Sequence, residues 1–214
     1  MQGVVGSSPI SSTIFITLNR TSGLNMLYLM RHGKTDWNID KKIQSQYNMS
    51  LNEQGRHQAR IAAKDLQPYN INKIVSSDLA RAAETADIVG GALRVRVTYD
   101  TRLREYDFGM LAGQSEQDLT PDIVATLITE PYVFGAEAFD ATFRRVANFI
   151  KQVDFNQNTL VVTHGGIMYF AMCFFENHNK LDIDSLLDKY INTKIDNTAI
   201  FRVQNINSKM QRVR

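Results

Sequence analysis

The sequence predicts an α/β fold, a three-layer α/β/α sandwich with a mostly parallel sheet. Short apolar segments alternate along the chain with longer segments of helical periodicity, which is the pattern of a parallel sheet covered on both faces. Two of the apolar segments are typical of buried strands, Leu27–Met30 and Thr159–Thr163. Each leads into a histidine followed by glycine, His32-Gly33 and His164-Gly165. Because ligand sites in such sheets lie at the carboxyl ends of the strands, these two ends form the predicted site.

The other elements follow from caps, periodicity and helix breakers. Asn52 is a suitable N-cap for a helix that runs to about Leu66, and Pro68 marks its end. The remaining predictions are a strand over Lys73–Ser76, a helix over Leu79–Val89 capped by Ser77 or Asp78 and closed by Gly90-Gly91, a strand over Val95–Thr98, an irregularly helical cap region over Ser115–Phe139, a helix over Thr142–Val153 and a strand over Thr198–Val203.

Composition indicates one globular domain. The chain has 214 residues, of which 43% are hydrophobic and 21% charged, so it can bury a sizeable core. The net charge is +2, and no basic stripe of the kind that binds nucleic acid is present, so the predicted partner is a small anion. The single cysteine, Cys173, excludes an internal disulfide framework and a cysteine metal cluster. It lies in an apolar helix, which predicts a buried, inert thiol.

Residues Met1–Asn25 differ from the rest. They are rich in Ser, Thr, Gly and Asn, and Arg20 is their only charge. We expect either a leader from an upstream start or a disordered tail, with the folded domain over 26–214. The apolar patch Ile14–Leu18 is too short for a secretory signal and follows no basic residue. No later segment reaches the length of a membrane span, so we expect a cytoplasmic protein that does not bind a membrane.

Polar side chains gather where the first strand ends. Arg31 and His32 stand at the strand end, and Gly33 lets the backbone turn closely around a ligand. Thr35 and Asn38 add short hydrogen-bonding groups. On Arg-His-Gly alone, a plain strand-to-loop turn and a functional site are about equally supported. The second strand that ends in His-Gly favours the functional site.

Arg81 falls in the first turn of a predicted helix that follows a strand. Free N–H groups and the helix dipole favour an anion at such a place. A guanidinium adds a planar fork that matches phosphate oxygens. Arg81 is therefore a candidate phosphate ligand rather than a solvated surface residue.

Five motifs follow one another in an order that is informative as a set. They are Arg31–Asn38 (RHGKTDWN), Leu51–Gly55 (LNEQG), Ser76–Ala86 (SSDLARAAETA), Leu103–Gly109 (LREYDFG) and Thr163–Gly166 (THGG). Over about Met26 to Val203, the chain resembles the histidine phosphatase superfamily, which includes cofactor-dependent phosphoglycerate mutases and many small phosphatases. The resemblance implies the phosphoglycerate mutase-like version of the sandwich.

The resemblance also implies roles for individual residues. His32 would be the nucleophile, forming a phosphohistidine through its outer ring nitrogen, and Arg31, Arg81 and His164 would surround the phosphate. Glu105 corresponds to the acidic residue that the family uses as proton donor.

Two positions near these residues need separate mention. Asp107 is a weaker competitor for the proton-donor role. The polar segment Asp36–Ser50 is predicted to be a loop over the strand ends, and we call it the entrance loop. The family commonly has a Gln-Gly pair in this loop where this chain has Gln44-Ser45, and Gln44 is a further candidate for phosphate binding. No metal or other cofactor is expected, because the chain shows no carboxylate cluster that would hold a metal.

Three functions fit this pattern. The first is a metal-independent phosphomonoesterase that acts on a small phosphorylated metabolite. The second is a mutase, against which His164 is followed by Gly165-Gly166-Ile167 where glycolytic mutases typically have Gly-Asn-Ser, and Glu105–Gly109 lacks their Glu-Arg-His-Tyr-Gly form. The third is a non-catalytic phosphate-binding module, which would need a missing catalytic residue, and none is missing.

Overall fold

The computed structural model describes residues 25–177 and 179–214. Within these residues, six strands form one sheet in the order β3-β2-β4-β1-β5-β6. The pairs β1–β4, β2–β4 and β2–β3 are parallel, and the pairs β1–β5 and β5–β6 are antiparallel, so the predicted mostly parallel sheet is confirmed. The strands are β1 (Leu27–Arg31), β2 (Lys73–Ser76), β3 (Val97–Tyr99), β4 (Thr159–Thr163), β5 (Ile200–Val203) and β6 (Gln211–Arg212).

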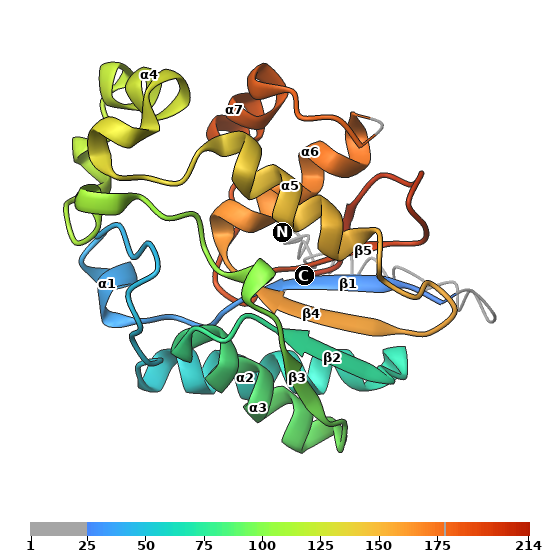
Figure 1. Ribbon diagram of the computed structural model, residues 1–214. Coiled ribbons are helices and arrows are strands. Elements are labelled where there is room, and N and C mark those ends of the chain that lie inside the picture. The colour runs from blue at the N-terminus through green and yellow to red at the C-terminus, as the bar shows by residue number, and fades with distance from the viewer. Residues whose placement is uncertain (1–24, 178) are drawn as a thin grey trace, which may run out of the picture.

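Helices cover both faces of the sheet, which confirms the predicted three-layer sandwich (Figure 1). The pair α2 and α3 lies on one face, and α5 and α6 lie on the other, with α7 packed against α6. Helices α1 and α4 lie beyond the carboxyl ends of the strands. The helices are α1 (Asp36–Ile39), α2 (Glu53–Leu66), α3 (Ala80–Leu93), α4 (Pro121–Thr129), α5 (Phe139–Ile150), α6 (Gly165–Glu176) and α7 (Ile183–Asn192). Short 3-10 turns cover Gln67–Tyr69, Thr101–Leu103, Gly109–Leu111, Glu116–Asp118 and Pro131–Phe134.

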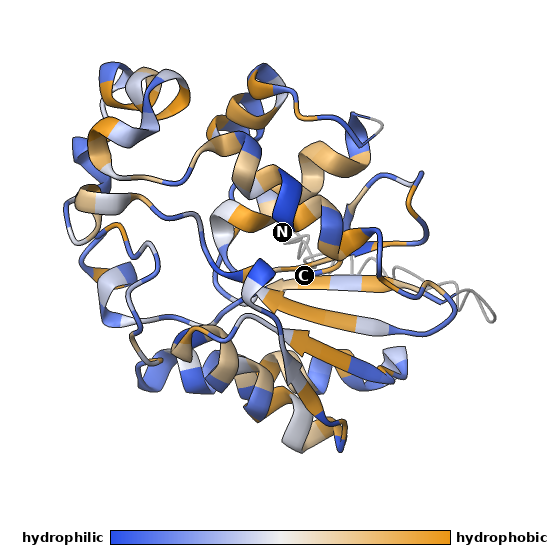
Figure 2. Cartoon of the chain, in the orientation of Figure 1, coloured by the Kyte–Doolittle hydropathy of each residue, from blue (hydrophilic) through white to orange (hydrophobic). Residues whose placement is uncertain are grey.

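The central strands are apolar on both sides because each side meets a layer of helices. Leu27 and Leu29 of β1 belong to the core shared with α5 and α6, whereas Tyr28 and Met30 belong to the core under α2 and α3. Figure 2 shows these strands as the most continuously hydrophobic part of the chain. Cys173 is fully buried in the first core, as predicted.

Helix α3 differs from the prediction at both ends. It begins at Ala80, and neither residue predicted to cap it does so. Instead, the backbone N–H of Ala80 donates to Oδ1 of Asn48, 2.7 Å away in a distant loop. The helix continues through Gly90-Gly91 to Leu93. A Cβ at Gly90 would lie 2.7 Å from the carbonyl oxygen of Val95, so this glycine serves close packing and not helix termination.

The other differences are shifts of boundaries. Strand β3 begins two residues later than predicted, β5 begins at Ile200, and α5 begins at Phe139 and ends at Ile150. The early start of α5 was not predicted because its N-cap is Ala138, which makes no capping hydrogen bond through its side chain. The predicted leader lies outside the described residues, apart from Asn25. In the described part of the chain, no helix has the length and apolar character needed to span a membrane.

Candidate active site

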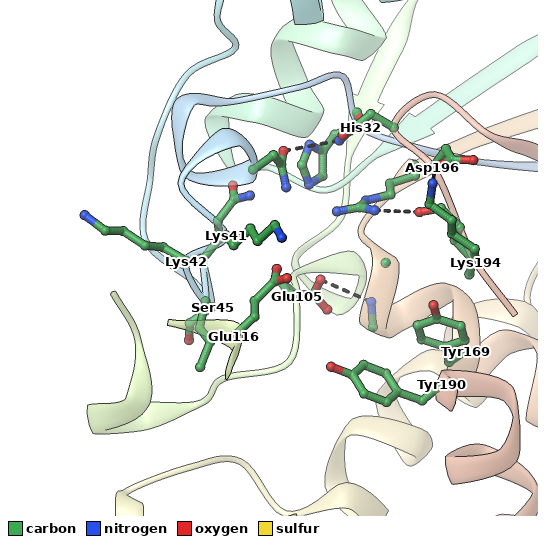
Figure 3. A pocket seen from close by; sticks show the side chains of 18 of the residues that line it. His32, Lys41, Lys42, Ser45, Glu105, Glu116, Tyr169, Tyr190, Lys194 and Asp196 are labelled. Atoms are coloured by element: carbon green, nitrogen blue, oxygen red, sulfur yellow. Dashed lines mark hydrogen bonds and ion pairs between the residues drawn. The ribbon is translucent and has the colours of Figure 1, made fainter. Parts of the chain in front are cut away.

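A pocket of about 990 Å³ opens at the carboxyl ends of the central strands (Figure 3). Two of the predicted site residues, Thr35 and His164, are fully buried and do not line its surface. The predicted residues that line it are Arg31, His32, Asn38, Gln44, Arg81 and Glu105.

His32 follows the last residue of β1, and both of its ring nitrogens have hydrogen-bond partners. Its Nδ1 lies 2.7 Å from the carbonyl oxygen of Gly33, so Nδ1 carries the proton in the neutral ring. Its Nε2 accepts from Nε of Arg81 at 3.2 Å. Burial lowers the pKa of His32 well below its usual value, and the charges of Arg81 and Arg31 lower the pKa further. At neutral pH the ring is therefore uncharged, with a lone pair on Nε2.

The turn after His32 depends on a close approach of two backbones. A Cβ at Gly33 would lie 2.6 Å from the carbonyl oxygen of Gly55, so the first two sequence motifs touch at their glycines. The N–H of Gly33 donates to Oγ1 of Thr85 at 3.0 Å. From the far end of the chain, the side-chain amide of Asn197 donates to the carbonyl oxygen of His32 at 3.1 Å. These contacts fix the orientation of the His32 ring.

Arg81 lies in the first turn of α3, as predicted, and has no exposed surface. Its terminal nitrogens donate to the carbonyl oxygens of Tyr47 and Ser45, each at 2.8 Å. Burial lowers its pKa to about 10, so the guanidinium remains charged at neutral pH. Arg81 thus faces His32 and anchors the entrance loop at the same time.

Two buried nitrogens beside His32 have no hydrogen-bond partner among the described residues. One is Nε of Arg31, whose terminal nitrogen donates to the carbonyl oxygen of Ile195 at 2.5 Å. The other is Nδ1 of His164, whose Nε2 lies 2.9 Å from Oγ of Ser77. Buried polar groups are normally paired, so each of these nitrogens can form a hydrogen bond with a ligand.

His164 lies next to His32. The centroids of the His32 and His164 rings are 5.2 Å apart. Burial lowers the pKa of His164 well below its usual value, and the neighbouring Arg81 lowers the pKa further. When the hydroxyl of Ser77 donates to Nε2, the proton of the neutral ring is on Nδ1, where it can be donated to a ligand.

Glu105 lies in the pocket with its carboxylate held by two backbone N–H groups. Oε1 accepts from Tyr106 at 2.9 Å and Oε2 from Gly166 at 3.2 Å. A Cβ at Gly166 would collide with Oε1 of Glu105, which explains the second glycine after His164. Each carboxylate oxygen keeps a further lone pair that faces the pocket.

Asp107, the competitor for the same role, does not line the pocket. Its Oδ1 accepts from Oγ of Ser45 at 3.0 Å and from the N–H of Gly109 at 3.0 Å. The geometry therefore favours Glu105 over Asp107 as the acid that reaches a ligand.

The segment that carries Glu105 is fixed by a side chain from α5. The guanidinium of Arg145 donates to the carbonyl oxygens of Arg102, Arg104 and Glu105 at 2.7, 2.6 and 3.1 Å. It also pairs with both carboxylate oxygens of Glu137, at 2.8 and 2.9 Å. Arg145 thereby ties the backbone of Glu105 to α5.

The weaker candidates have different surroundings. Thr35 and Asn38 form a capping box at the start of α1, and Oδ1 of Asn38 also accepts from the amide of Asn197 at 3.2 Å. Both residues therefore shape the loop after His32, and only Asn38 reaches the pocket surface. Gln44 lines the pocket, and its Oε1 is buried without a partner among the described residues.

The pocket surface is predominantly basic. Six basic residues line it against three acidic ones, which favours an anionic ligand. Figure 3 shows Lys41 extending into the pocket, whereas Lys42 points away from it. The basic residues are Arg31, Lys34, Lys41, Lys42, Arg81 and Lys194, and the acidic residues are Glu105, Glu116 and Asp196.

Sequence reasoning did not single out several residues that build this site. Lys41 carried a usable signal, because it lies in a polar segment predicted to cover the strand ends. Asn197 and Arg145 carried none, since their contacts are with residues far away in the sequence. Ser77 was predicted as a helix cap, and its contact with His164, 87 residues away, was not predicted. In the described part of the chain, no group of three or more His, Cys, Asp or Glu side chains could hold a metal ion. The metal-free site stays a prediction.

The fold and the site define an α/β protein with two histidines at neighbouring strand ends and a predominantly basic pocket beside them. The family model of the histidine phosphatase superfamily (branch 1) matches residues 27–211. The chain therefore belongs to the histidine phosphatase superfamily, and the resemblance seen in the sequence is confirmed.

Proteins similar in sequence are named as probable phosphoglycerate mutases. A protein called probable phosphoglycerate mutase GpmB from Proteus mirabilis is 37% identical over 116 residues, which cover 54% of this chain and 50% of that relative. Its namesake from Serratia proteamaculans is 40% identical over 95 residues, covering 44% of each chain. The matched part thus spans about half the length of these relatives or less.

Solved structures share the fold over most of the chain. A mycobacterial glucosyl-3-phosphoglycerate phosphatase in complex with VO3 has a TM-score of 0.70 and 24% identity, covering 89% of this chain and 98% of that one. A mutant phosphoserine phosphatase from Entamoeba histolytica in complex with phosphoserine has a TM-score of 0.72 and 22% identity, covering 89% and 96%. At these identities the likeness establishes the fold.

Proposed function

We propose that the protein is a metal-independent phosphomonoesterase that transfers a phosphoryl group from a small phosphate ester to His32 and then to water. The observation that carries this proposal is the group of atoms around Nε2 of His32. That nitrogen is unprotonated and faces Arg81, and Arg31 and His164 each have a buried nitrogen that no described residue pairs with. A phosphate group at this place would supply the oxygens that these nitrogens lack.

In the first step, Nε2 of His32 attacks phosphorus in line with the ester oxygen. The N–P bond forms and the P–O bond breaks, while the cationic side chains stabilise charge on the equatorial oxygens. Glu105, protonated at this stage, gives its proton to the departing oxygen. The alcohol leaves, and Glu105 becomes a carboxylate.

In the second step, water attacks the phosphohistidine. The carboxylate of Glu105 takes a proton from the water as the new P–O bond forms. The N–P bond breaks and its electron pair returns to Nε2, which regenerates neutral His32 with inorganic phosphate in the pocket. No step needs a metal ion, because Arg31 and Arg81 supply the positive charge.

A mutase is the second candidate, because the relatives described above are named as probable phosphoglycerate mutases. In that case a second substrate hydroxyl, and not water, receives the phosphoryl group from His32. The basic side chains at the outer end of the pocket, Lys41 and Lys194, support a small anionic metabolite in either case.

One experiment separates the two candidates. The purified protein is incubated with 3-phosphoglycerate and with a panel of phosphate esters in the presence of EDTA, and both free phosphate and the isomeric phosphoglycerate are measured. We expect phosphate release that EDTA leaves unchanged and that His32→Ala abolishes. Isomerisation faster than phosphate release would establish the mutase, and activity that chelation removes would refute the proposed mechanism.

A further inference from the structure

The active-site pocket adjoins a second cavity of about 80 Å³, which we call the apolar branch. The two cavities share five lining residues, so they lie side by side. The shared residues are Phe108, Leu119, Gly166, Tyr169 and Tyr190. Helices α4 and α7 also contribute to the walls of the branch, with Val124 and Leu127 on α4 and Leu186 and Leu187 on α7.

The branch begins beside the group that would release the substrate alcohol. Gly166 lines both cavities, and its N–H donates to Oε2 of Glu105. In the view of Figure 3, Glu105 lies between His32 and the rings of Tyr169 and Tyr190. An ester whose phosphorus is at His32 and whose leaving oxygen is at Glu105 therefore directs its next carbon atoms toward the branch.

The walls of the branch differ from the rest of the pocket. No residue with a charged side chain lines the branch in the described part of the chain. The hydroxyl of Tyr169 is already engaged, donating to the carbonyl oxygen of Thr193 at 2.8 Å, so the aromatic ring is what this residue offers. Lys41 and Glu116, by contrast, line only the larger pocket. A charged group in the branch would lose its hydration without gaining a partner.

We propose that the apolar branch binds a short aliphatic part of the leaving group, so that preferred substrates are phosphomonoesters of uncharged aliphatic alcohols. The volume is about half of that of a cavity that holds benzene, which allows roughly three carbon atoms. This proposal rests on the proposed phosphatase activity and specifies its substrate class.

Straight-chain alkyl phosphates from ethyl to octyl test the proposal. Their leaving alcohols differ little in basicity, so differences in kcat/KM report binding of the chain. Each methylene that enters the branch should raise kcat/KM about three- to fourfold, as expected for burying a methylene group. The rise should cover roughly three methylenes and then level off, because the branch is full.

A pair of variants on α4 links any rise to the branch. Val124→Phe should fill the cavity and abolish the rise while leaving ethyl phosphate hydrolysis unchanged, since Val124 lines the branch and not the larger pocket. Ile128→Phe is the matched control, because Ile128 is a half-buried residue of the same helix that lines neither cavity. It should keep the rise of the wild type.

Alkylphosphonates of the same lengths give a readout that needs no hydrolysis. Calorimetry should show the same three- to fourfold gain in affinity per methylene. Equal kcat/KM from ethyl to hexyl phosphate, or equal phosphonate affinities, would overturn the apolar branch as a substrate site. Length-dependent phosphonate binding without hydrolysis of any ester would instead refute the phosphatase activity and leave the branch in place.

Discussion

The inner and outer ends of the pocket are built in opposite ways. At the inner end, His32 and Arg81, with His164 packed behind the pocket wall, are almost completely buried, and each is tied to backbone or side-chain partners. At the outer end, Lys194 and Tyr190 are exposed and come from segments that lie beyond the strand ends. Buried, interlocked groups hold one geometry, whereas loop and cap residues change at low cost to the fold.

This difference predicts two kinds of mutational effect. Substitutions at the inner end should slow every substrate, because all phosphate esters share the phosphoryl group. Substitutions at the outer end should change the ranking of substrates while leaving the phosphoryl step intact.

Arg81→Ala should give the largest loss. It removes a cation beside Nε2 of His32 and the hydrogen bonds that the guanidinium donates to the carbonyl oxygens of Ser45 and Tyr47. We expect kcat/KM to fall about a thousandfold for all phosphate esters, within the range for removing one stabilising donor. Steady-state kinetics on an alkyl and a nitrophenyl phosphate would show this.

Arg81→Lys is the matched control. An ammonium keeps the charge but cannot make the two-pronged contact, so only part of the rate should return. If Arg81→Ala behaves as the wild type, Arg81 does not contact phosphate and serves only the entrance loop.

Glu105→Gln should have a smaller effect that depends on the leaving group. An alkyl phosphate releases a strongly basic alkoxide, so phosphoryl transfer to His32 should slow about a hundredfold. A nitrophenyl phosphate releases a stable phenolate and should be slowed far less. Because Glu105 also activates water in the second step, the bursts must be compared and not the steady states. Equal slowing of both bursts would remove Glu105 from the proton-donor role.

Asp107→Asn provides the comparison for this prediction. Asp107 does not line the pocket and accepts hydrogen bonds from Ser45 and Gly109. We expect any loss of rate to be equal for both leaving groups. A loss confined to alkyl phosphates would transfer the acid role from Glu105 to Asp107.

The sequence alone was sufficient where function depends on local pattern. Both histidines were found because each follows an apolar strand and precedes a glycine, and the sandwich followed from the alternation of strands and helices. The positions of Asn197 and Ser77 could not be found in this way. Asn197 reaches His32 across 165 residues of sequence, and Ser77 is a partner of His164 because β2 pairs with β4.

The same reason accounts for the errors in the helices. Asn48 caps α3 from a loop about thirty residues earlier, so the sequence near Ala80 shows no capping residue. The sequence predicts that Gly90 ends the helix, but Gly90 lies inside α3, where the carbonyl oxygen of Val95 leaves no room for a Cβ. In both cases a tertiary contact replaced the local signal.

Arg145→Ala tests a residue that acts through the position of Glu105. Three backbone carbonyl oxygens lose the hydrogen bond from the guanidinium, and the Glu105 segment loses its tie to α5. We expect about a tenfold slower burst with alkyl phosphates and less slowing with nitrophenyl phosphate, in the lower part of the range for general acid catalysis. Arg144→Ala is the control, because Arg144 is exposed and pairs with Asp140, its neighbour on the same helix. Equal slowing with both esters would mean that Arg145 supports the fold alone.

The smallest effect concerns stability against acid. The pKa values of His32 and His164 lie well below 6.5 in the folded protein, because both rings are buried. Below pH 6.5 the unfolded chain binds protons that the folded chain does not, so the free energy of unfolding falls as the pH is lowered. Each histidine should contribute a slope of about 1.4 kcal/mol per pH unit between pH 6.5 and its folded pKa.

Denaturant unfolding at several pH values measures this slope. His164→Gln should reduce it, since a glutamine does not titrate. A slope that His164→Gln leaves unchanged would contradict the burial of a neutral ring at the inner end.

The central claim is that His32 carries the phosphoryl group on Nε2. The most direct measurement is rapid quenching in alkali after exposure to a phosphate ester, followed by mass spectrometry of the peptides and nuclear magnetic resonance of the phosphohistidine isomer. The account predicts an acid-labile, alkali-stable phosphate on His32 at Nε2, because Nδ1 is engaged by the carbonyl oxygen of Gly33. Phosphate on Nδ1, or labelling that survives His32→Ala, would contradict it.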